Sequence, residues 1–248
     1  EPGIYALSNH LLDTPWPKTR GLKADLAARW GVGTAHGRTV TIAGGGGDNA
    51  ASAVGMGIVN PGQGFVSLGT SGVIFIAGAR FGPNPAQAVH AFCHALPGRW
   101  HQMSVMLSAA SAVSWAVQAF GFADEAALLA AAATLDARQR ARAPLFLPYL
   151  SGERSPHNNA DAQGVLFGLT QAHAPADIAY AVVEGVSFGL RDGLDTLARP
   201  DGALALVGGG AIPARRLHMV LADPFALIVH QPDLALCLRG AIQCQPQK

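Results

Sequence analysis

Three glycine-rich runs, at 44–47, 69–72 and 208–210, follow stretches with the composition of β-strands, and Asp48 comes directly after the first run. Glycine admits positive φ angles and lets backbone N–H groups approach a phosphate closely, because it has no Cβ. A carboxylate at such a strand end can accept the proton of a substrate hydroxyl. Any single run is better explained as a tight turn. Three runs with an adjacent aspartate are more informative and favour a site that contacts phosphate.

Asp48 and Asn49 each keep two interpretations at this point. Asp48 is either a base that takes a hydroxyl proton or the N-cap of a helix of small residues over 50–57. Asn49 is either a hydrogen-bonding partner of a substrate or a turn residue. Composition alone does not decide between the functional and the structural roles.

Common nucleotide and nucleophile motifs do not match these glycine runs. None fits G-x-x-x-x-G-K-[ST], and none fits G-x-G-x-x-G with an acidic residue about 20 positions later. A P-loop NTPase and a Rossmann dinucleotide site are therefore disfavoured. The segment 69–73 also misses the serine-hydrolase elbow G-x-S-x-G, because Val73 stands where the last glycine belongs.

Two further polar groups could do chemistry by residue type. One is a set of possible metal ligands, namely His90, Cys93, His94 and His101. It has one cysteine and no acidic residue, so packing and backbone hydrogen bonding are favoured and no metal site is expected. The other is the loop 151–159, which contains Glu153, Arg154, His157 and Asn158. Composition fits a solvated surface loop and a functional loop equally well.

Overall composition restricts the class of protein. The chain has 248 residues, of which 50% are hydrophobic and 13% charged, and its formal net charge is +1. Disorder, nucleic-acid binding and binding to anionic membranes are disfavoured, because each needs low hydrophobicity or concentrated charge. Three widely spaced cysteines fit a reducing compartment, and no signal peptide is visible. We therefore expect a cytoplasmic protein.

Alternating strands and helices predict an α/β fold. The pattern predicts a strand, tight turn and strand over 65–76, and a long helix over 175–198 that begins at a proline. Glycines at 185, 189 and 193 indicate close packing along one face of that helix. The remaining expected elements are helices over 22–30, 102–123, 124–140 and 213–221, strands over 40–43, 203–207 and 226–229, and extended segments over 90–95 and 100–103. The uncharged stretch 102–123 is interpreted as a buried helix rather than a membrane span, because polar side chains recur along it.

The residues just described resemble the FGGY carbohydrate kinases. The matching segments lie in the order of that family and extend over most of 22–225. Two of them, 93–97 and 104–111, resemble the xylulose-phosphorylating branch of the family in particular. The matching segments are 43–50, 67–72, 94–97 with 103–111, 146–154 with 156–159, and 208–211.

The resemblance implies an α/β protein with an actin/hexokinase-like, ribonuclease H-like ATPase domain. Residues 1–64 would be the tail of a preceding sugar-binding domain, and 65–248 the nucleotide-binding domain. The implied reaction transfers the γ-phosphoryl group of ATP, with Mg²⁺, to a hydroxyl of D-xylulose. The implied partners are the sugar and ATP, with a homodimer as one option and no nucleic acid or membrane.

The resemblance also assigns roles to single residues. Asp48 would be the general base and a substrate contact, and Asn49 a second contact to the ketose. The ATP phosphates would be held by Gly69, Thr70 and Ser71, and the adenosine would be approached by Gly208, Gly209 and Gly210.

The chain resembles only the second half of a family member. The Asp-x-Gly-Thr phosphate loop and the sugar-contacting Met-His-Gly segment of the family's first half have no counterpart in it. The match also decays after Gly210, which a truncation or frameshift of the coding sequence would explain. The alternatives are a kinase for glycerol, ribulose or gluconate, and a non-catalytic nucleotide-binding remnant.

Overall fold

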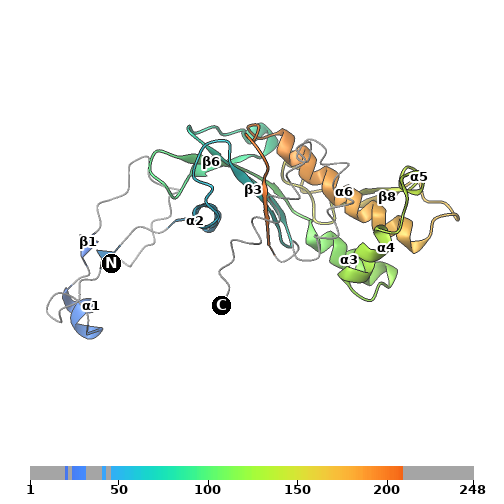
Figure 1. Ribbon diagram of the computed structural model, residues 1–248, viewed down its shortest axis with the longest axis horizontal. Coiled ribbons are helices and arrows are strands. Elements are labelled where there is room, and N and C mark those ends of the chain that lie inside the picture. Colours follow the sequence, from blue (N-terminus) through green and yellow to red (C-terminus); the bar gives the residue numbers. More distant parts are fainter. Residues whose placement is uncertain (1–19, 22–23, 32–40, 43–45, 209–248) are drawn as a thin grey trace.

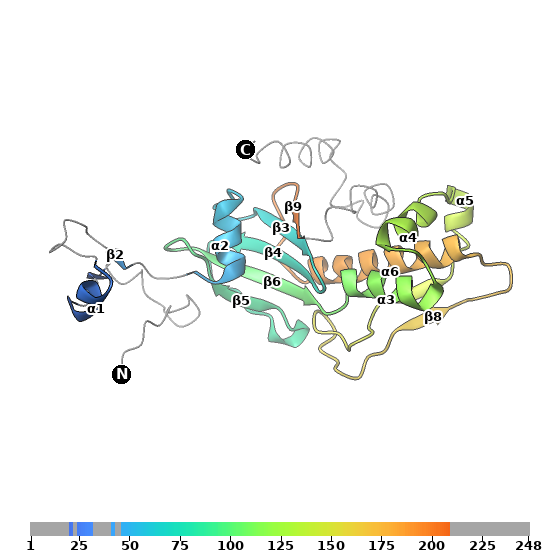
Figure 2. The same ribbon diagram turned by 90° about the horizontal axis from the view of Figure 1, so that it is seen from below.

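A five-stranded sheet forms the centre of the structure (Figures 1 and 2). The computed structural model describes residues 20–21, 24–31, 41–42 and 46–208. The strand order is β5-β6-β4-β3-β9, and all neighbours are antiparallel except β3 and β9, which are parallel. The strands are β3 (Gly64–Leu68), β4 (Gly72–Gly78), β5 (His90–Cys93), β6 (Trp100–Met106) and β9 (Ala205–Val207).

This strand order has the features expected of a ribonuclease H-like sheet. β3, β4 and β6 form an antiparallel meander, and β9 returns to lie parallel to β3 on its other side. A parallel return needs a long crossover, and the helices between β6 and β9 supply it. The expectation of an α/β fold is confirmed.

Side chains alternate between the two faces of the sheet, so β3, β4 and β6 each contribute buried residues to two apolar clusters. One cluster lies against α2 (Asp48–Gly55) and contains Ala53, Phe65, Phe75, Ala77 and Met103. The other lies against the helices that follow β6 and contains Val66, Leu68, Ile74, Ile76 and Met106. Both faces of the sheet are therefore covered, as in other α/β proteins.

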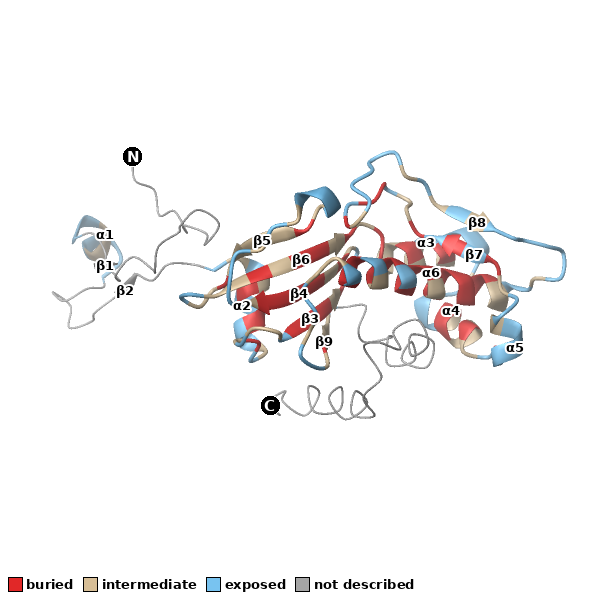
Figure 3. Ribbon diagram, turned by 90° about the horizontal axis from the view of Figure 1, so that it is seen from above, coloured by how far each residue is buried: buried red, intermediate tan, exposed pale blue. Residues whose placement is uncertain are grey.

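α6 (Pro175–Asp195) is the central helix of the second face. Thirteen of its 21 residues are buried, and Figure 3 shows buried residues along most of its length. It packs against the sheet and against α3 (Ala110–Phe120) and α4 (Glu125–Ala132). Burying a side chain such as Val182 or Leu190 stabilises the fold by roughly 1.5–3 kcal/mol each. The long helix predicted from Pro175 is confirmed.

The three glycines of α6 each face a close neighbour from another element. A Cβ added at any of them would come within 3.0 Å of that neighbour, closer than real Cβ atoms come. Close packing along this face is therefore confirmed. The pairs are Gly185 with the Phe146 carbonyl group, Gly189 with the Met106 side chain, and Gly193 with the Ser104 hydroxyl group.

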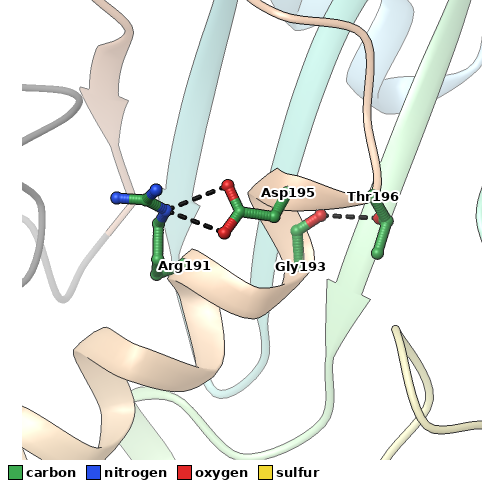
Figure 4. Close-up of polar contacts among 4 residues, drawn as sticks. All are labelled: Arg191, Gly193, Asp195 and Thr196. Atoms are coloured by element: carbon green, nitrogen blue, oxygen red, sulfur yellow. Dashed lines mark hydrogen bonds and ion pairs between the residues drawn. The ribbon is translucent and has the colours of Figure 1, made fainter.

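The C-terminal turn of α6 is held by two local contacts (Figure 4). Arg191 Nε lies 3.0 Å from Asp195 Oδ1, and the Thr196 hydroxyl donates to the Gly193 carbonyl at 2.7 Å. The carboxylate side chain is 60% exposed, so an i,i+4 ion pair of this kind contributes only about 0.3–0.5 kcal/mol. The Thr196 bond closes the last turn of the helix, after which the chain returns to the sheet as β9.

The helix predicted over 102–123 is wrong in its first part. β6 runs through Met106, because each of its seven residues pairs with a residue of β4. α3 begins only at Ala110. Ser104 therefore lies on a strand beside Gly193 and belongs to no polar helix stripe. In the part of the chain that the structure describes, no helix is long and apolar enough to cross a membrane.

The helix predicted over 124–140 is two shorter helices, α4 and α5 (Ala137–Arg140). Asp124 caps α4 by accepting from the Ala127 N–H at 2.7 Å, and Asp136 caps α5 by accepting from the Gln139 N–H at 2.8 Å. An aspartate that caps a helix sits at its start, so the second one interrupts the helical run.

The remaining elements are smaller. The strand pair β7 (Leu145–Leu147) and β8 (Val165–Phe167) was not predicted. At the described positions, α1 (Ala24–Arg29) and β2 (Thr41–Ile42) agree with the helix predicted over 22–30 and the strand predicted over 40–43. β1 (Arg20–Gly21), which pairs with β2, and the single turn η3 (Pro85–Gln87) were not predicted. The elements predicted over 213–221 and 226–229 lie outside the described residues.

Candidate active site

The turn that joins β3 to β4, here called the glycine turn (Gly69–Ser71), is fixed from behind by the start of α3. The backbone N–H groups of Ala109 and Ala110 donate to the carbonyl oxygens of Thr70 and Gly69, both at 3.0 Å. Ser111 adds two bonds to the Thr70 carbonyl, from its N–H at 3.3 Å and its hydroxyl at 2.9 Å. The first two carbonyls of the turn therefore face α3.

The N–H groups of the glycine turn are arranged differently from its carbonyls. Gly69 N–H donates to the Ser71 carbonyl at 3.1 Å, and this hydrogen bond joins the first and last residues of the turn. Among the described residues, the structure gives no acceptor to the N–H of Thr70 or of Ser71. The positive end of the α3 dipole adjoins the same turn. Adjacent N–H groups of this kind can donate to an anion such as a phosphate.

Gly208 lies beside the start of the glycine turn. β9 pairs in parallel with β3 up to Val207↔Ser67, so Gly208 comes level with Leu68. Gly208 has φ +99°, and a Cβ there would stand 2.5 Å from the Leu68 carbonyl oxygen. Only glycine fits this position without strain. The structure thus brings two of the predicted glycine sites to one edge of the sheet, at the carboxyl ends of two parallel strands. Gly209 and Gly210 lie outside the described residues.

Asp48 is the first residue of α2 and is exposed. The N-cap is Gly47, and no side chain caps the helix, so the structure does not have the predicted cap at Asp48. Asp48 Oδ1 instead accepts from Asn49, from its N–H at 2.7 Å and from its side-chain amide at 3.2 Å. A carboxylate in the first turn of a helix is stabilised by the helix dipole. Asp48 and Asn49 therefore form one polar group at the start of α2.

The structure does not join this pair to the glycine turn. α2 packs through Ala53 on the cluster of Phe65, Phe75 and Ala77, which belongs to the half of the hairpin away from the turn. In Figure 2, α2 lies toward the end of the sheet away from α3. No hydrogen bond links Asp48 or Asn49 to Gly69–Ser71 within the described residues. A substrate that contacts both the Asp48–Asn49 pair and the glycine turn would have to extend from one to the other.

The loop 151–159, here called the polar strap, is docked on the sheet through the buried residues Gly152, Glu153 and Ser155, and its other residues are at least partly exposed. Ser155 is buried and makes three bonds: its N–H donates to the Val105 carbonyl at 3.1 Å, its hydroxyl accepts from the Val105 N–H at 3.2 Å, and the same hydroxyl donates to the Ala88 carbonyl at 2.9 Å. These bonds hold the middle of the loop next to the end of β6.

Glu153 of the polar strap is 3% exposed; the sequence placed it among four polar residues of this loop but gave it no role of its own. Its Oε1 accepts from the N–H of Leu107 at 3.0 Å and of Arg154 at 2.7 Å. Its Oε2 is buried and has no partner among the described residues. Burial raises the pKa of this carboxyl, although the two N–H donors and the nearby His157 and Arg154 oppose the rise. A glutamate in a loop gives no sequence signal of such burial.

The histidines considered as metal ligands pack as rings. The His101 ring stacks on Phe75 with centroids 4.4 Å apart, and the His94 ring meets the edge of Phe75 at 5.8 Å. His94 Nε2 also lies 3.1 Å from the Ile58 carbonyl oxygen. The described residues contain no group of three or more His, Cys, Asp or Glu side chains that could hold a metal.

Comparison with protein families gives one match, over residues 64–245, to the C-terminal domain of the FGGY family of carbohydrate kinases. The xylulose kinase of Klebsiella pneumoniae is 50% identical over 209 residues, which are 83% of this chain and 41% of that protein. The xylulose kinase of Escherichia coli K12 is 50% identical over 197 residues, which are 78% of this chain and 39% of that protein. The chain thus spans about two fifths of the length of these curated relatives.

Among solved structures, too, this chain is similar to xylulose kinases. The xyloylose (xylulose) kinase of Brucella ovis has 46% identity and a TM-score of 0.71, and the match covers 82% of this chain and 41% of that one. The xylulose kinase of Rhodospirillum rubrum has 27% identity and a TM-score of 0.68, covering 82% of this chain and 40% of that one. The sheet and helices described above are therefore those of a sugar-kinase ATPase domain.

Proposed function

Because the chain belongs to the FGGY family of carbohydrate kinases, we propose that it forms the nucleotide-binding part of an enzyme that transfers the γ-phosphoryl group of ATP to D-xylulose. The observation that carries the proposal is the glycine turn. Its carbonyls are engaged by α3, and the N–H groups of Thr70 and Ser71 have no acceptor among the described residues. The product would be D-xylulose 5-phosphate.

ATP phosphates suit the glycine turn on physical grounds. Phosphoryl transfer depends on positioning and on donors aimed at phosphate oxygens, and backbone N–H groups held by a helix are already oriented. Gly208 adjoins the same edge of the sheet, where its lack of a side chain lets the chain pass directly beside the Leu68 backbone, and we propose that it approaches the adenosine there. Gly209 and Gly210, which follow it, are proposed to line the same part of the site.

Asp48 is proposed as the general base and Asn49 as a contact to the ketose. A sugar hydroxyl is a weak nucleophile, and a carboxylate beside it orients it and accepts its proton as the bond to phosphorus forms. Asp48 is exposed at the start of α2, and the Asn49 amide bonds one of its oxygens. The other carboxylate oxygen is left for a hydroxyl.

Mg²⁺ would neutralise charge on the β- and γ-phosphates. Protein-bound Mg²⁺ commonly keeps several waters and takes its other ligands from substrate phosphates and one or two carboxylates. Among the described residues, no group of three or more His, Cys, Asp or Glu side chains could hold a metal ion.

The choice of sugar and the domain boundary rest on the relatives. Xylulose kinases at 50% identity support D-xylulose over glycerol, ribulose or gluconate. The match to the family's C-terminal domain begins at residue 64, which supports a nucleotide domain over 65–248 and the tail of a sugar-binding domain over 1–64. Cytoplasmic location and a homodimer remain proposals on the same basis.

Calorimetric titration of the chain tests the nucleotide site, with Mg²⁺-ATP and adenosine as ligands. We expect weak binding of ATP, tighter than that of adenosine, because only ATP can use the glycine turn. Equal affinities would contradict the role of the turn, and no binding of either ligand would contradict a nucleotide site in this chain.

Turnover is tested separately with a panel of sugars and coupled detection of ADP, on the complete kinase that contains this chain. D-Xylulose should be the fastest substrate. Faster turnover of glycerol would contradict the proposed sugar. ATP binding without turnover of any sugar would favour the non-catalytic alternative.

A further inference from the structure

We propose that Glu153 is a positioning residue for the glycine turn: its carboxylate fixes the segment 107–111, and that segment holds the turn in the conformation that receives ATP phosphates. The inference rests on the proposed function, because it takes the glycine turn to be the phosphate site. It adds to the site a residue more than 80 positions away in sequence from the turn.

The connection runs through consecutive hydrogen bonds. Glu153 Oε1 accepts from the Leu107 N–H at 3.0 Å, and the carbonyl of the same Leu107 accepts from the Ser71 hydroxyl at a long 3.4 Å. The next residues carry the stronger contacts, since the N–H groups of Ala109 and Ala110 bind the turn carbonyls at 3.0 Å. Glu153 Oε1 thus fixes the first residue of the segment 107–111. Among the described residues, this is the only segment outside the β3–β4 hairpin that makes hydrogen bonds to the glycine turn.

Burial of the Glu153 carboxylate destabilises the fold, which is unfavourable for a residue with only a structural role. A buried carboxylate loses its hydration, and a buried polar atom without a partner is destabilising. Only Oε1 makes bonds, while Oε2 has no partner among the described residues. A charged acceptor does, however, make a stronger bond to an N–H group than a neutral one. That gain is shared by the N–H groups of Arg154 and Leu107, and Leu107 lies next to the glycine turn.

The polar strap does not need the Glu153 side chain to dock. Ser155 binds both polar groups of Val105 and the Ala88 carbonyl. The backbone of Glu153 also exchanges two bonds with Asn159, each at 2.8 Å. Ser155→Ala is therefore a matched control, because it weakens the docking of the same strap without touching the Leu107 peptide.

Three variants of the full chain test the proposal: Glu153→Asp, Glu153→Gln and Ser155→Ala. Aspartate keeps the charge but withdraws the oxygen by one methylene, whereas glutamine keeps an acceptor oxygen at the same reach. Hydrogen exchange is measured over 69–71 and 107–111, and calorimetry measures ATP and adenosine affinity. Loss of a charged hydrogen bond corresponds to about 10-fold or more in an equilibrium constant.

Glu153→Asp should speed exchange over 107–111 about 10-fold and weaken ATP binding by a similar factor, leaving adenosine affinity unchanged. Glu153→Gln should restore part of both, because it keeps the acceptor oxygen without the charge, and Ser155→Ala should change neither. The inference is overturned if Glu153→Asp behaves as the unsubstituted chain, matches Ser155→Ala, weakens adenosine equally, or fails to fold. The exchange data decide this even if the unsubstituted chain binds no ATP, an outcome that would contradict the proposed function instead.

Discussion

The packing of α6 against its neighbours predicts that glycine-to-alanine substitutions change stability to different extents, according to what lies beside each glycine. In an ordinary helix interior, alanine is more stable than glycine by about 1 kcal/mol. At Gly185, however, an added Cβ would collide with the backbone carbonyl oxygen of Phe146. Phe146 belongs to β7, which is paired with β8 and therefore cannot move alone. Gly185→Ala should destabilise the protein even though it improves helix propensity.

The size of the effect follows from two opposing contributions. Overpacking a well-filled interior costs about 1–3 kcal/mol, and contact with backbone favours the upper end. Subtracting the gain of about 1 kcal/mol in helix propensity leaves a net loss of about 2 kcal/mol. For a domain of this size, each kcal/mol shifts the melting temperature by about 2–4 °C, so we expect a fall of about 4–8 °C.

Two other glycines calibrate the measurement, which is thermal unfolding followed by circular dichroism. At Gly189 the added Cβ would meet Cε of Met106 at 2.8 Å. That methyl group is the far end of a flexible side chain, so Gly189→Ala should be close to neutral. At Gly55 of α2 nothing lies within 4 Å, and Gly55→Ala should stabilise by up to about 1 kcal/mol. A Gly185→Ala variant as stable as Gly55→Ala would refute the packing argument.

Three further predictions concern the site. In a complete kinase, Asp48→Asn should lower kcat by about 10²–10⁴-fold with ATP affinity and melting temperature unchanged, and near-normal turnover would rule out the proposed base. Burial raises the pKa of the Glu153 carboxyl in the folded protein above its unfolded value of about 4.3. The contribution of this carboxyl to folding stability therefore falls as the pH rises from the unfolded pKa through the folded pKa. Glu153→Gln should therefore gain in melting temperature relative to the unsubstituted chain as the pH rises above about 4, and a constant difference would contradict the raised pKa. Gly208→Ala should destabilise by at least about 1–2 kcal/mol because of its positive φ, whereas Gly202→Ala, with nothing within 4 Å, should not.

Local signals predicted the parts of the fold that local chemistry determines. The hairpin around Gly69–Ser71 was predicted from β-branched and aromatic runs on either side of a glycine-containing turn. α6 was predicted from Pro175 and its apolar periodicity, and its glycine spacing correctly indicated close packing. In each case the deciding residues lie within the element itself, so the sequence contains the needed information.

Two of the errors occurred where a partner distant in sequence determines the structure. Residues 102–106 are compatible with a helix by composition, and pairing with β4 makes them a strand. Burial of Glu153 likewise depends on the approach of Leu107, which is 46 residues away. The resemblance to a family supplies residue roles such as that of Asp48, but it supplies them only for motifs already associated with that family. Residues that act through another peptide, as we infer for Glu153, become visible only when the hydrogen bonds that join separate segments are known.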